Sequence, residues 1–205
     1  VVLGAGVAGC AAAYYLAREG VKVTVVEREA IGCGASGYAL GLLNPLTGEG
    51  IPGPMEPVVM ASFRMHQELW PALRQDSGVD FQAELVPHLE LCFTPEDVAK
   101  QRAEMERWSR AEGFTCRWLE GDEVRKLEPR LSSHVVGAVL LERVGMLDSY
   151  RYTLALAQAA ERRGAAIRHG VAVGVREEGS GARVVLQDGE VACDAVVVAL
   201  GPWSS

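Results

Sequence analysis

The chain has 205 residues, of which 49% are hydrophobic, and its formal net charge at pH 7 is −7. This acidic balance argues against a nucleic-acid partner, because no basic stripe is available to contact phosphates. Every apolar run is shorter than the roughly 20 residues of a membrane-spanning helix, so we expect no transmembrane segment. Five cysteines without a CxxC pair or metal-ligand spacing predict no metal site. They also predict small, buried, reduced thiols in a cytoplasmic compartment.

The chain begins with a glycine-rich turn between a short apolar run and a helix. Gly4-Ala5-Gly6-Val7-Ala8-Gly9 precedes a predicted helix over residues 10–18, and a predicted strand over 21–26 ends at Glu27. That spacing is typical of a dinucleotide-binding βαβ unit. In such a unit the pyrophosphate meets the helix N-terminus and the acid accepts the ribose hydroxyls. The alternative is a glycine-rich turn in some other α/β fold.

The middle of the chain predicts helices that alternate with short strands. A loop dense in small residues over 32–37 and an irregular connector over 48–57 come before them. The expected elements are a helix over 58–77 kinked at Pro71, two short strands over 81–93 broken at Pro87, a helix over 95–111 with Thr94 as its N-cap, a strand over 114–119, a helix capped by Asp122 and ending before Pro129, and a strand over 135–141.

The last part of the chain returns to a nucleotide-domain pattern. A long amphipathic helix is expected to begin at Asp148 or Ser149 and to end at Gly164. Strands over 166–168, 171–176 and 184–187, a hairpin turn at Asp188-Gly189 and a buried strand over 195–200 follow.

These elements predict an α/β fold, in which a Rossmann-like domain is built from both ends of the chain. Residues 1–57 and 145–205 would form this domain, and residues 58–144 would form an inserted antiparallel α+β substrate domain. Only three residues precede the glycine turn, and no initiator Met is present. We therefore expect a truncated piece of a longer protein that is inactive on its own.

The ordered motifs resemble the D-amino-acid-oxidase-like family of FAD-dependent oxidoreductases. Glycine oxidase, sarcosine oxidase and the D-amino-acid dehydrogenases belong to that family. The stretches that carry the resemblance are Gly4–Gly9 with Glu27-Arg28, Gly34-Ala35-Ser36-Gly37, Gly41-Leu42-Leu43, Leu127-Glu128-Pro129, Gly145-Met146-Leu147-Asp148 and Val196–Trp203.

The resemblance implies that the cofactor is FAD. Its pyrophosphate would lie over the glycine turn, its adenosine ribose on Glu27 and its adenine beside Arg28. The Ser36 hydroxyl would donate to the phosphate and ribityl side. Residues 41–43 would run beside the isoalloxazine ring. The residues implied to bind FAD are Gly4, Gly6, Val7, Ala8, Gly9, Glu27, Arg28, Gly34, Ala35, Ser36, Gly41, Leu42, Leu43, Ala172, Val173, Ala199 and Gly201.

The resemblance also implies the activity, which is oxidation of a C–N bond of an amino acid or secondary amine by hydride transfer to flavin N5. We assign no catalytic residue, because the family's substrate-binding groups lie beyond residue 205, and the sequence leaves the oligomeric state open. The four histidines fit no catalytic pattern and are interpreted as structural or surface residues. One alternative is action on a modified tRNA wobble uridine, since Asn44-Pro45-Leu46 is similar to enzymes of that kind. Another is a dinucleotide-binding module without catalysis.

Overall fold

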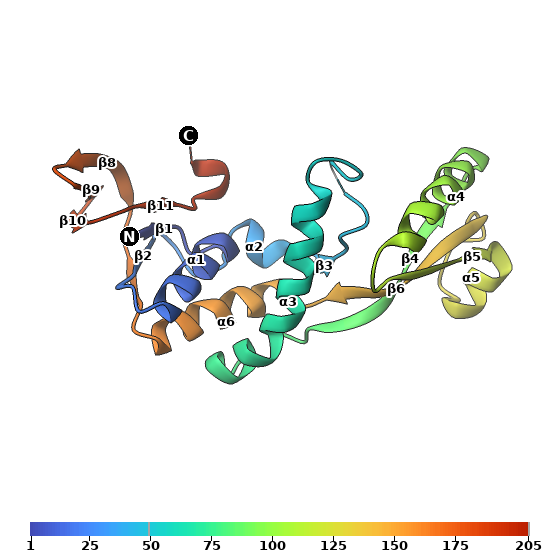
Figure 1. Ribbon diagram of the computed structural model, residues 1–205, viewed down its shortest axis with the longest axis horizontal. Coiled ribbons are helices and arrows are strands. Elements are labelled where there is room, and N and C mark those ends of the chain that lie inside the picture. The colour runs from blue at the N-terminus through green and yellow to red at the C-terminus, as the bar shows by residue number, and fades with distance from the viewer. Residues whose placement is uncertain (49, 205) are drawn as a thin grey trace. The chain divides into compact units, whose positions relative to one another are not determined.

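The computed structural model describes residues 1–48 and 50–204, which form two compact units (Figure 1). Unit 1 contains Val1–Gly41, Gln67–Gln82 and the chain from Leu147 onward, and unit 2 contains Leu42–His66 and Ala83–Met146. The mixed α/β class predicted from the sequence is confirmed. The domain division predicted at residues 57 and 144 stays a prediction.

Unit 1 is built on a four-stranded parallel sheet with the strand order β11-β1-β2-β7. Buried Val2 lies opposite buried Val25, so the predicted βαβ unit is present. Helices α1 and α6 lie side by side (Figure 1). The elements are β1 (Val2–Leu3), α1 (Val7–Arg18), β2 (Thr24–Glu27), α2 (Ala35–Tyr38), α6 (Ser149–Arg162), β7 (Ala166–His169), β11 (Val197–Val198) and the 3-10 helix η1 (Gly201–Trp203).

A second, antiparallel sheet of unit 1 consists of β8 (Ala172–Glu178), β9 (Gly181–Leu186) and β10 (Gly189–Cys193). Gly189 pairs with Leu186, which confirms the hairpin turn predicted at Asp188-Gly189. A buried cluster of Leu3, Val26, Val184 and Leu186 joins this sheet to the parallel one. The carboxyl ends of β1 and β2 are thereby fixed in place next to the glycine turn.

Unit 2 is organised around the long strand β6 (Gly137–Met146), which pairs antiparallel with three other strands. Its core packs Trp108 and Phe114 against Val139 and Leu141. The other elements are β3 (Leu42–Leu43), the part of α3 (Glu56–Ser77) up to residue 66, β4 (Glu84–Cys92), α4 (Pro95–Arg110), β5 (Thr115–Glu120) and α5 (Gly121–Leu127).

Helix boundaries follow the capping residues. The Thr94 side chain accepts a hydrogen bond from Asp97 N, and the Asp97 carboxylate accepts one from Thr94 N. This capping box confirms Thr94 as the N-cap of α4. The Asp148 carboxylate likewise accepts from Arg151 N at the start of α6. For α5, however, the N-cap is Glu120 and not Asp122, because Glu120 forms the reciprocal box with Glu123.

Three other predictions were wrong in detail. Helix α1 begins at Val7, so the glycine turn overlaps its first turn. Two strands separated at Pro87 were predicted, but the structure has one continuous strand, β4. A register shift between Val86 and His88 accommodates the proline, which has no N–H to donate. Within the described residues β11 pairs on one side only, with β1, and the strand expected to be buried is exposed there, at 37% for Val197 and 53% for Val198. The kink expected at Pro71 stays a prediction, and α3 continues through that residue.

Asp76 links the helices of unit 1. Its Oδ2 accepts a hydrogen bond of 2.8 Å from the Tyr14 hydroxyl of α1 and one of 2.6 Å from Arg163 Nη2, just after α6. The Arg163 guanidinium, together with the Tyr14 hydroxyl, lowers the pKa of Asp76 despite its partial burial. The carboxylate therefore contributes stability as long as it is ionised.

We expect Asp76→Asn to lower the free energy of unfolding by about 1–3 kcal/mol at neutral pH. Since the pKa of Asp76 is lower in the folded chain than in the unfolded one, this contribution is present above the unfolded pKa of about 4 and is lost as the pH falls. Urea unfolding at neutral pH and near pH ~3 measures the difference. Asp188→Asn, which removes an exposed carboxylate beside Arg168, is the control. An Asp76→Asn effect that is equal at both pH values would contradict the argument.

Candidate cofactor site

Backbone packs against backbone at the glycine turn between β1 and α1. Gly4 has a φ of +99°, which favours glycine. A Cβ on Gly9 would lie 2.0 Å from the Gly4 carbonyl oxygen, and a Cβ on Gly4 would lie 2.5 Å from the Ala199 carbonyl oxygen. Side chains are therefore excluded at both positions, and α1, β1 and the end of β11 meet closely.

The N-terminus of α1 is suited to an anion. Its N-cap, Gly6, supplies no side-chain cap, and its first turn carries no acidic residue. Val7 and Ala8 are exposed there, while Gly9 is buried beneath them. The helix dipole and the N–H groups of the first turn favour negative charge at such a position. This arrangement fits the predicted place of a pyrophosphate.

Glu27 stands at the end of β2 and is fastened to the glycine turn. Its Oε2 accepts a hydrogen bond of 2.7 Å from Ala5 N, and its Oε1 accepts one of 2.9 Å from Glu29 N. An ionised carboxylate offers about four acceptor positions, so two remain for the hydroxyls of a ribose. The negative charge would also repel a 2′-phosphate.

The small-residue loop covers the same helix terminus. Gly32 N donates to Ala5 O at 3.0 Å, and Ser36 Oγ accepts from Val7 N at 2.9 Å. Because the hydroxyl accepts this bond, its own proton is available for another acceptor. A phosphate oxygen at the α1 N-terminus would be such an acceptor, in keeping with the predicted donor role of Ser36. Gly34, the N-cap of α2, precedes Ala35 on the same side of the loop.

Arg28 and Trp203 form a stacked pair that the motif analysis missed. The Arg28 guanidinium carbon lies 4.5 Å from the Trp203 ring centroid. Arg28 Nε also lies 3.2 Å from Glu29 Oε1. A Cβ on Gly34 would lie 3.7 Å from the indole, so Trp203 reaches the small-residue loop. The available signal was the presence of an aromatic residue just after the last predicted strand.

The remaining predicted residues lie in different places. Gly41 of unit 1, with a φ of +82°, accepts a hydrogen bond of 3.0 Å from Leu147 N. Leu42 and Leu43 belong to unit 2, where they form β3 and pack on its core. The structure therefore brings together in unit 1 the glycine turn, Glu27, Arg28, the 34–36 loop and Ala199. Their roles toward FAD stay predictions, as do those of Gly41, Leu42, Leu43, Ala172, Val173 and exposed Gly201.

Beneath the glycine turn lies the buried thiol of Cys10, whose Sγ is 3.4 Å from Ala5 O. Burial, together with the Glu27 charge, raises the pKa of Cys10 to about 12. Cys92 is also buried, and burial raises its pKa. Cys33 is exposed, which corrects the prediction of a buried thiol there. Among the described residues no group of acids, histidines or cysteines could hold a metal ion.

We expect a thiol reagent at neutral pH to label Cys33 rapidly in the folded protein, because only an accessible thiolate reacts. Cys10 and Cys92 should react only after unfolding. Mass spectrometry of protein labelled with and without denaturant identifies the modified residues, and Cys33→Ser is the control. Rapid labelling of Cys10 in folded protein would mean that the glycine turn opens.

The histidines carry no arrangement that points to catalysis. His88 Nε2 lies 3.2 Å from Glu90 Oε1 on β4, and burial lowers the pKa of His66. His134 and His169 are exposed. Their interpretation as structural or surface residues therefore stays the simplest one.

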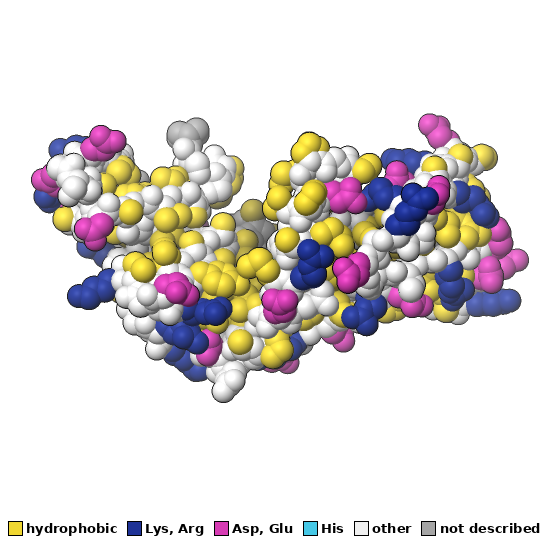
Figure 2. Space-filling view, in the orientation of Figure 1, with side chains coloured by type: hydrophobic (Ala, Val, Ile, Leu, Met, Phe, Trp, Pro, Cys, Tyr) yellow, Lys and Arg dark blue, Asp and Glu magenta, His cyan; other side chains and the backbone are white. Residues whose placement is uncertain are grey.

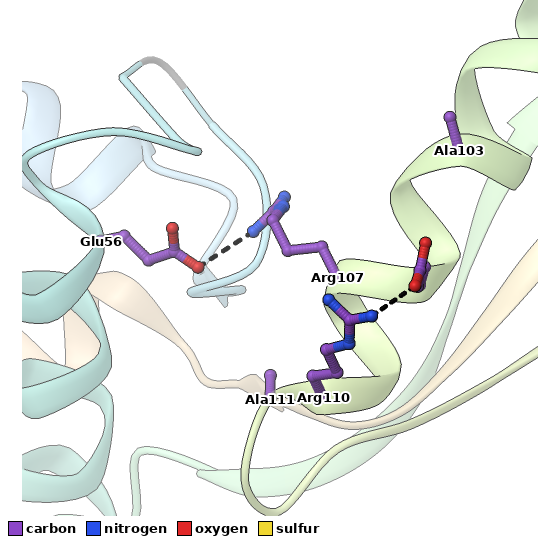
Figure 3. Close-up of a pocket in the computed structure, with 6 residues that line it drawn as sticks. Glu56, Ala103, Arg107, Arg110 and Ala111 are labelled. Carbon is purple, nitrogen blue, oxygen red and sulfur yellow. Dashed lines mark hydrogen bonds and ion pairs between the residues drawn. The ribbon is translucent and has the colours of Figure 1, made fainter.

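A shallow depression on unit 2 is lined by Glu56 and by residues of α4 (Figure 3). Arg107 crosses it, with Nη1 3.2 Å from Glu56 Oε1 and Nη2 2.7 Å from Leu46 O. Arg110 pairs with Glu106. The charged groups of this depression already have partners within the protein, so its geometry does not point to a ligand.

The Asn44-Pro45-Leu46 segment shapes a turn of unit 2. Asn44 Oδ1 accepts from Leu46 N at 3.1 Å, and Leu46 is fully buried. On the visible face of unit 2, positive and negative side chains are intermixed (Figure 2). The structure thus provides a packing reason for this segment.

Comparison with known proteins decides the family. The sequence profile described as DAO, FAD dependent oxidoreductase, matches residues 1–205. The chain belongs to this family. The resemblance inferred from the motifs is thereby confirmed, together with the FAD-dependent oxidoreductase class. No helix within residues 1–48 and 50–204 of this DAO-family chain is long and apolar enough to cross a membrane.

Relatives of this DAO-family chain include enzymes named for amino-acid and amine oxidation. A glycine oxidase of Geobacillus kaustophilus (strain HTA426) is 29% identical over 206 residues, which cover 100% of this chain and 54% of that protein. A 4-methylaminobutanoate oxidase (formaldehyde-forming) of Paenarthrobacter nicotinovorans is 32% identical over 213 residues, which cover 100% of this chain and 24% of that protein.

Solved structures agree with the family. The crystal structure of glycine oxidase from Bacillus cereus ATCC 14579 matches with a TM-score of 0.89 at 31% identity, covering 99% of this chain and 55% of that one. The Geobacillus kaustophilus enzyme matches with a TM-score of 0.92 at 28% identity. This DAO-family chain spans about half the length of the glycine oxidases that it matches.

Proposed function

We propose that the full-length protein is an FAD-dependent oxidoreductase that oxidises a C–N bond of an amino acid or secondary amine. The observation that carries this proposal is the geometry of unit 1. There an exposed helix N-terminus, the Glu27 carboxylate and the Ser36 hydroxyl surround one backbone turn whose glycines exclude side chains. The match to the DAO family and the names of its relatives support the class of substrate.

Within this site each group of the chain has a separate task. The α1 N-terminus and the Ser36 hydroxyl would bind the pyrophosphate, and the free acceptor positions of Glu27 would bind the adenosine ribose. When bound, the flavin would supply a two-electron acceptor at N5 for the hydride leaving the carbon next to nitrogen, and water would hydrolyse the resulting imine. The described residues would thus hold the cofactor, and the groups that position the substrate stay unassigned.

The experiment is an anaerobic screen of the full-length protein, in which bleaching of the flavin absorbance reports reduction. Glycine, N-methylglycine, D-alanine, L-proline and a longer N-methylated amino acid cover the proposed class. The matched 2-hydroxy acids, which present a C–O bond in place of the C–N bond, are the controls. We expect at least one amine to bleach the flavin and the hydroxy acids to leave it oxidised. Bleaching by hydroxy acids alone would contradict the proposed substrate class.

A further inference from the structure

The N-terminal half of α3 is apolar on two opposite sides. Residues 56–66 of this helix belong to unit 2, and two of them, Glu56 and Arg64, carry a formal charge at pH 7. Met60 and Phe63 pack against the core of unit 2, so one apolar side is already covered. The opposite side of a surface helix is ordinarily polar, and a helix that is apolar all round is typical of a buried position.

The second apolar side is open in the described part of the chain. Val58, Ser62 and Met65 follow one another at the i, i+4, i+7 spacing of one helix face, and Met55 lies one turn before Val58. Met55 is 50% exposed, Val58 58% and Met65 52%, and Ser62 is exposed as well. Successive helix residues are about 100° apart, so this face lies roughly opposite the residues that pack on the core. We call these four residues the α3 stripe.

The charged side chains of this half-helix lie off the stripe. Glu56 is turned toward α4, where its Oε1 lies 3.2 Å from Arg107 Nη1. Arg64 is two residues from Ser62 and therefore lies on the other side of the helix. The stripe thus presents apolar surface and one hydroxyl. Obligate interfaces are more hydrophobic than transient ones, so this composition favours a permanent partner.

The size of the stripe favours a partner within the same chain. A stable interface between two proteins buries roughly 800 Å² on each partner, contributed by about 20–30 residues. Three half-exposed side chains and one serine supply only a small part of that area. A partner in the same chain needs less area, because it does not lose the freedom of a separate molecule.

The relatives of this DAO-family chain are long enough to contain such a partner. The chain covers 54% of the Geobacillus kaustophilus glycine oxidase and 55% of the Bacillus cereus one. A full-length protein of that size has almost as much chain again that could pack against the described residues.

We propose that the α3 stripe is an internal docking surface, covered in the full-length protein by an apolar face of the chain that follows residue 205. Val58 and Met65 would then be interior residues of the whole protein, although residues 1–205 leave them open. FAD binding in unit 1 is not required for this contact, so the docking surface and the proposed function can fail separately.

The first test introduces a cysteine into the stripe of the full-length protein. Met65→Cys is compared with Arg64→Cys, because Arg64 is the neighbouring residue of the same helix, is exposed and lies off the stripe. Each protein reacts with a maleimide, and mass spectrometry follows the introduced thiol. Its rate in the folded protein is divided by its rate in urea. We expect this ratio to be at least about tenfold lower for Met65→Cys, because a covered thiol is inert.

A photocrosslinker then identifies what covers the stripe. The photoreactive residue p-benzoylphenylalanine takes the place of Met65 in the full-length protein, and mass spectrometry locates the crosslinked peptides after irradiation. We expect crosslinks within one chain to peptides that follow residue 205. Thermal unfolding checks that each variant is folded, and the same two experiments at Val58 replace any Met65 variant that is not.

Three outcomes would overturn the docking surface. Equal normalised rates for Met65→Cys and Arg64→Cys would mean that the stripe is open to solvent in the full-length protein. Crosslinks that join two chains, seen as a species of doubled mass, would assign the stripe to a second copy. Crosslinks only to peptides within residues 1–205 would mean that the described chain covers it. Failure of the protein to bind FAD would defeat the proposed function and would change none of these results.

Discussion

Replacing Gly9 with valine is expected to abolish FAD retention by the full-length protein. A Cβ at this position would lie 2.0 Å from the Gly4 carbonyl oxygen and 3.4 Å from the Ala199 Cβ, so α1 must move away from the sheet to accommodate it. Overpacking of this kind costs about 1–3 kcal/mol in well-packed regions. The N-terminus of α1 moves with the helix, and we expect the dissociation constant for FAD to rise by at least about a hundredfold.

Gly174→Val is the matched control for this prediction. Gly174 lies in β8 of the same unit, and nothing would lie within 4 Å of a Cβ there. Its FAD content should stay close to that of the unchanged protein. Absorbance spectra of the two purified variants and denaturant unfolding of their apoproteins measure the two effects separately. A Gly9→Val protein that keeps stoichiometric FAD would show that the pyrophosphate does not lie at this turn.

Replacing Glu27 with alanine is expected to weaken FAD binding and to destabilise the apoprotein as well. The substitution removes the acceptor of the buried Ala5 N–H and of the Glu29 N–H, at 2.7 and 2.9 Å. An unsatisfied buried donor costs about 1–3 kcal/mol, and a hydrogen bond to a charged group contributes a similar amount to binding. We therefore expect a loss of roughly 1–3 kcal/mol in unfolding free energy and at least a tenfold higher dissociation constant for FAD.

Glu19→Ala serves as the control for Glu27→Ala, because it removes an equal charge from the exposed C-terminal end of α1. It should leave the unfolding free energy and the dissociation constant for FAD within error of the values for the unchanged protein. Isothermal titration of apoprotein with FAD gives the dissociation constant, and urea unfolding gives the stability. An unchanged dissociation constant in a destabilised Glu27→Ala protein would assign Glu27 to the fold alone.

The parts predicted well from sequence depend on short-range rules. The glycine turn, the acid at the end of β2 and the caps at Thr94 and Asp148 each follow from chemistry within a few residues, and the structure contains all of them. The family motifs are local in the same sense. They therefore indicated the fold class and the FAD-dependent family before any tertiary contact was known.

The parts predicted poorly depend on contacts between distant segments. The bond from Val7 N to Ser36 Oγ and the stacking of Arg28 on Trp203 join residues far apart in the sequence. Within the described residues β11 pairs with a strand on one side only, and its apolar sequence does not reveal that pairing. A strand break was predicted at Pro87, but the structure has one continuous strand there with a register shift beside the proline. In each case the observed structure depends on contacts with other elements of the fold, which local sequence patterns do not contain.

The most direct test of the central claim, that the glycine turn and Glu27 of unit 1 bind FAD, is a titration of full-length apoprotein with FAD, FMN and NADPH. FAD contains the AMP half that these groups would hold, FMN lacks it, and NADPH carries the 2′-phosphate that Glu27 would repel. We predict tight, stoichiometric binding of FAD and far weaker binding of the other two. Tight binding of NADPH without any binding of FAD would contradict the claim.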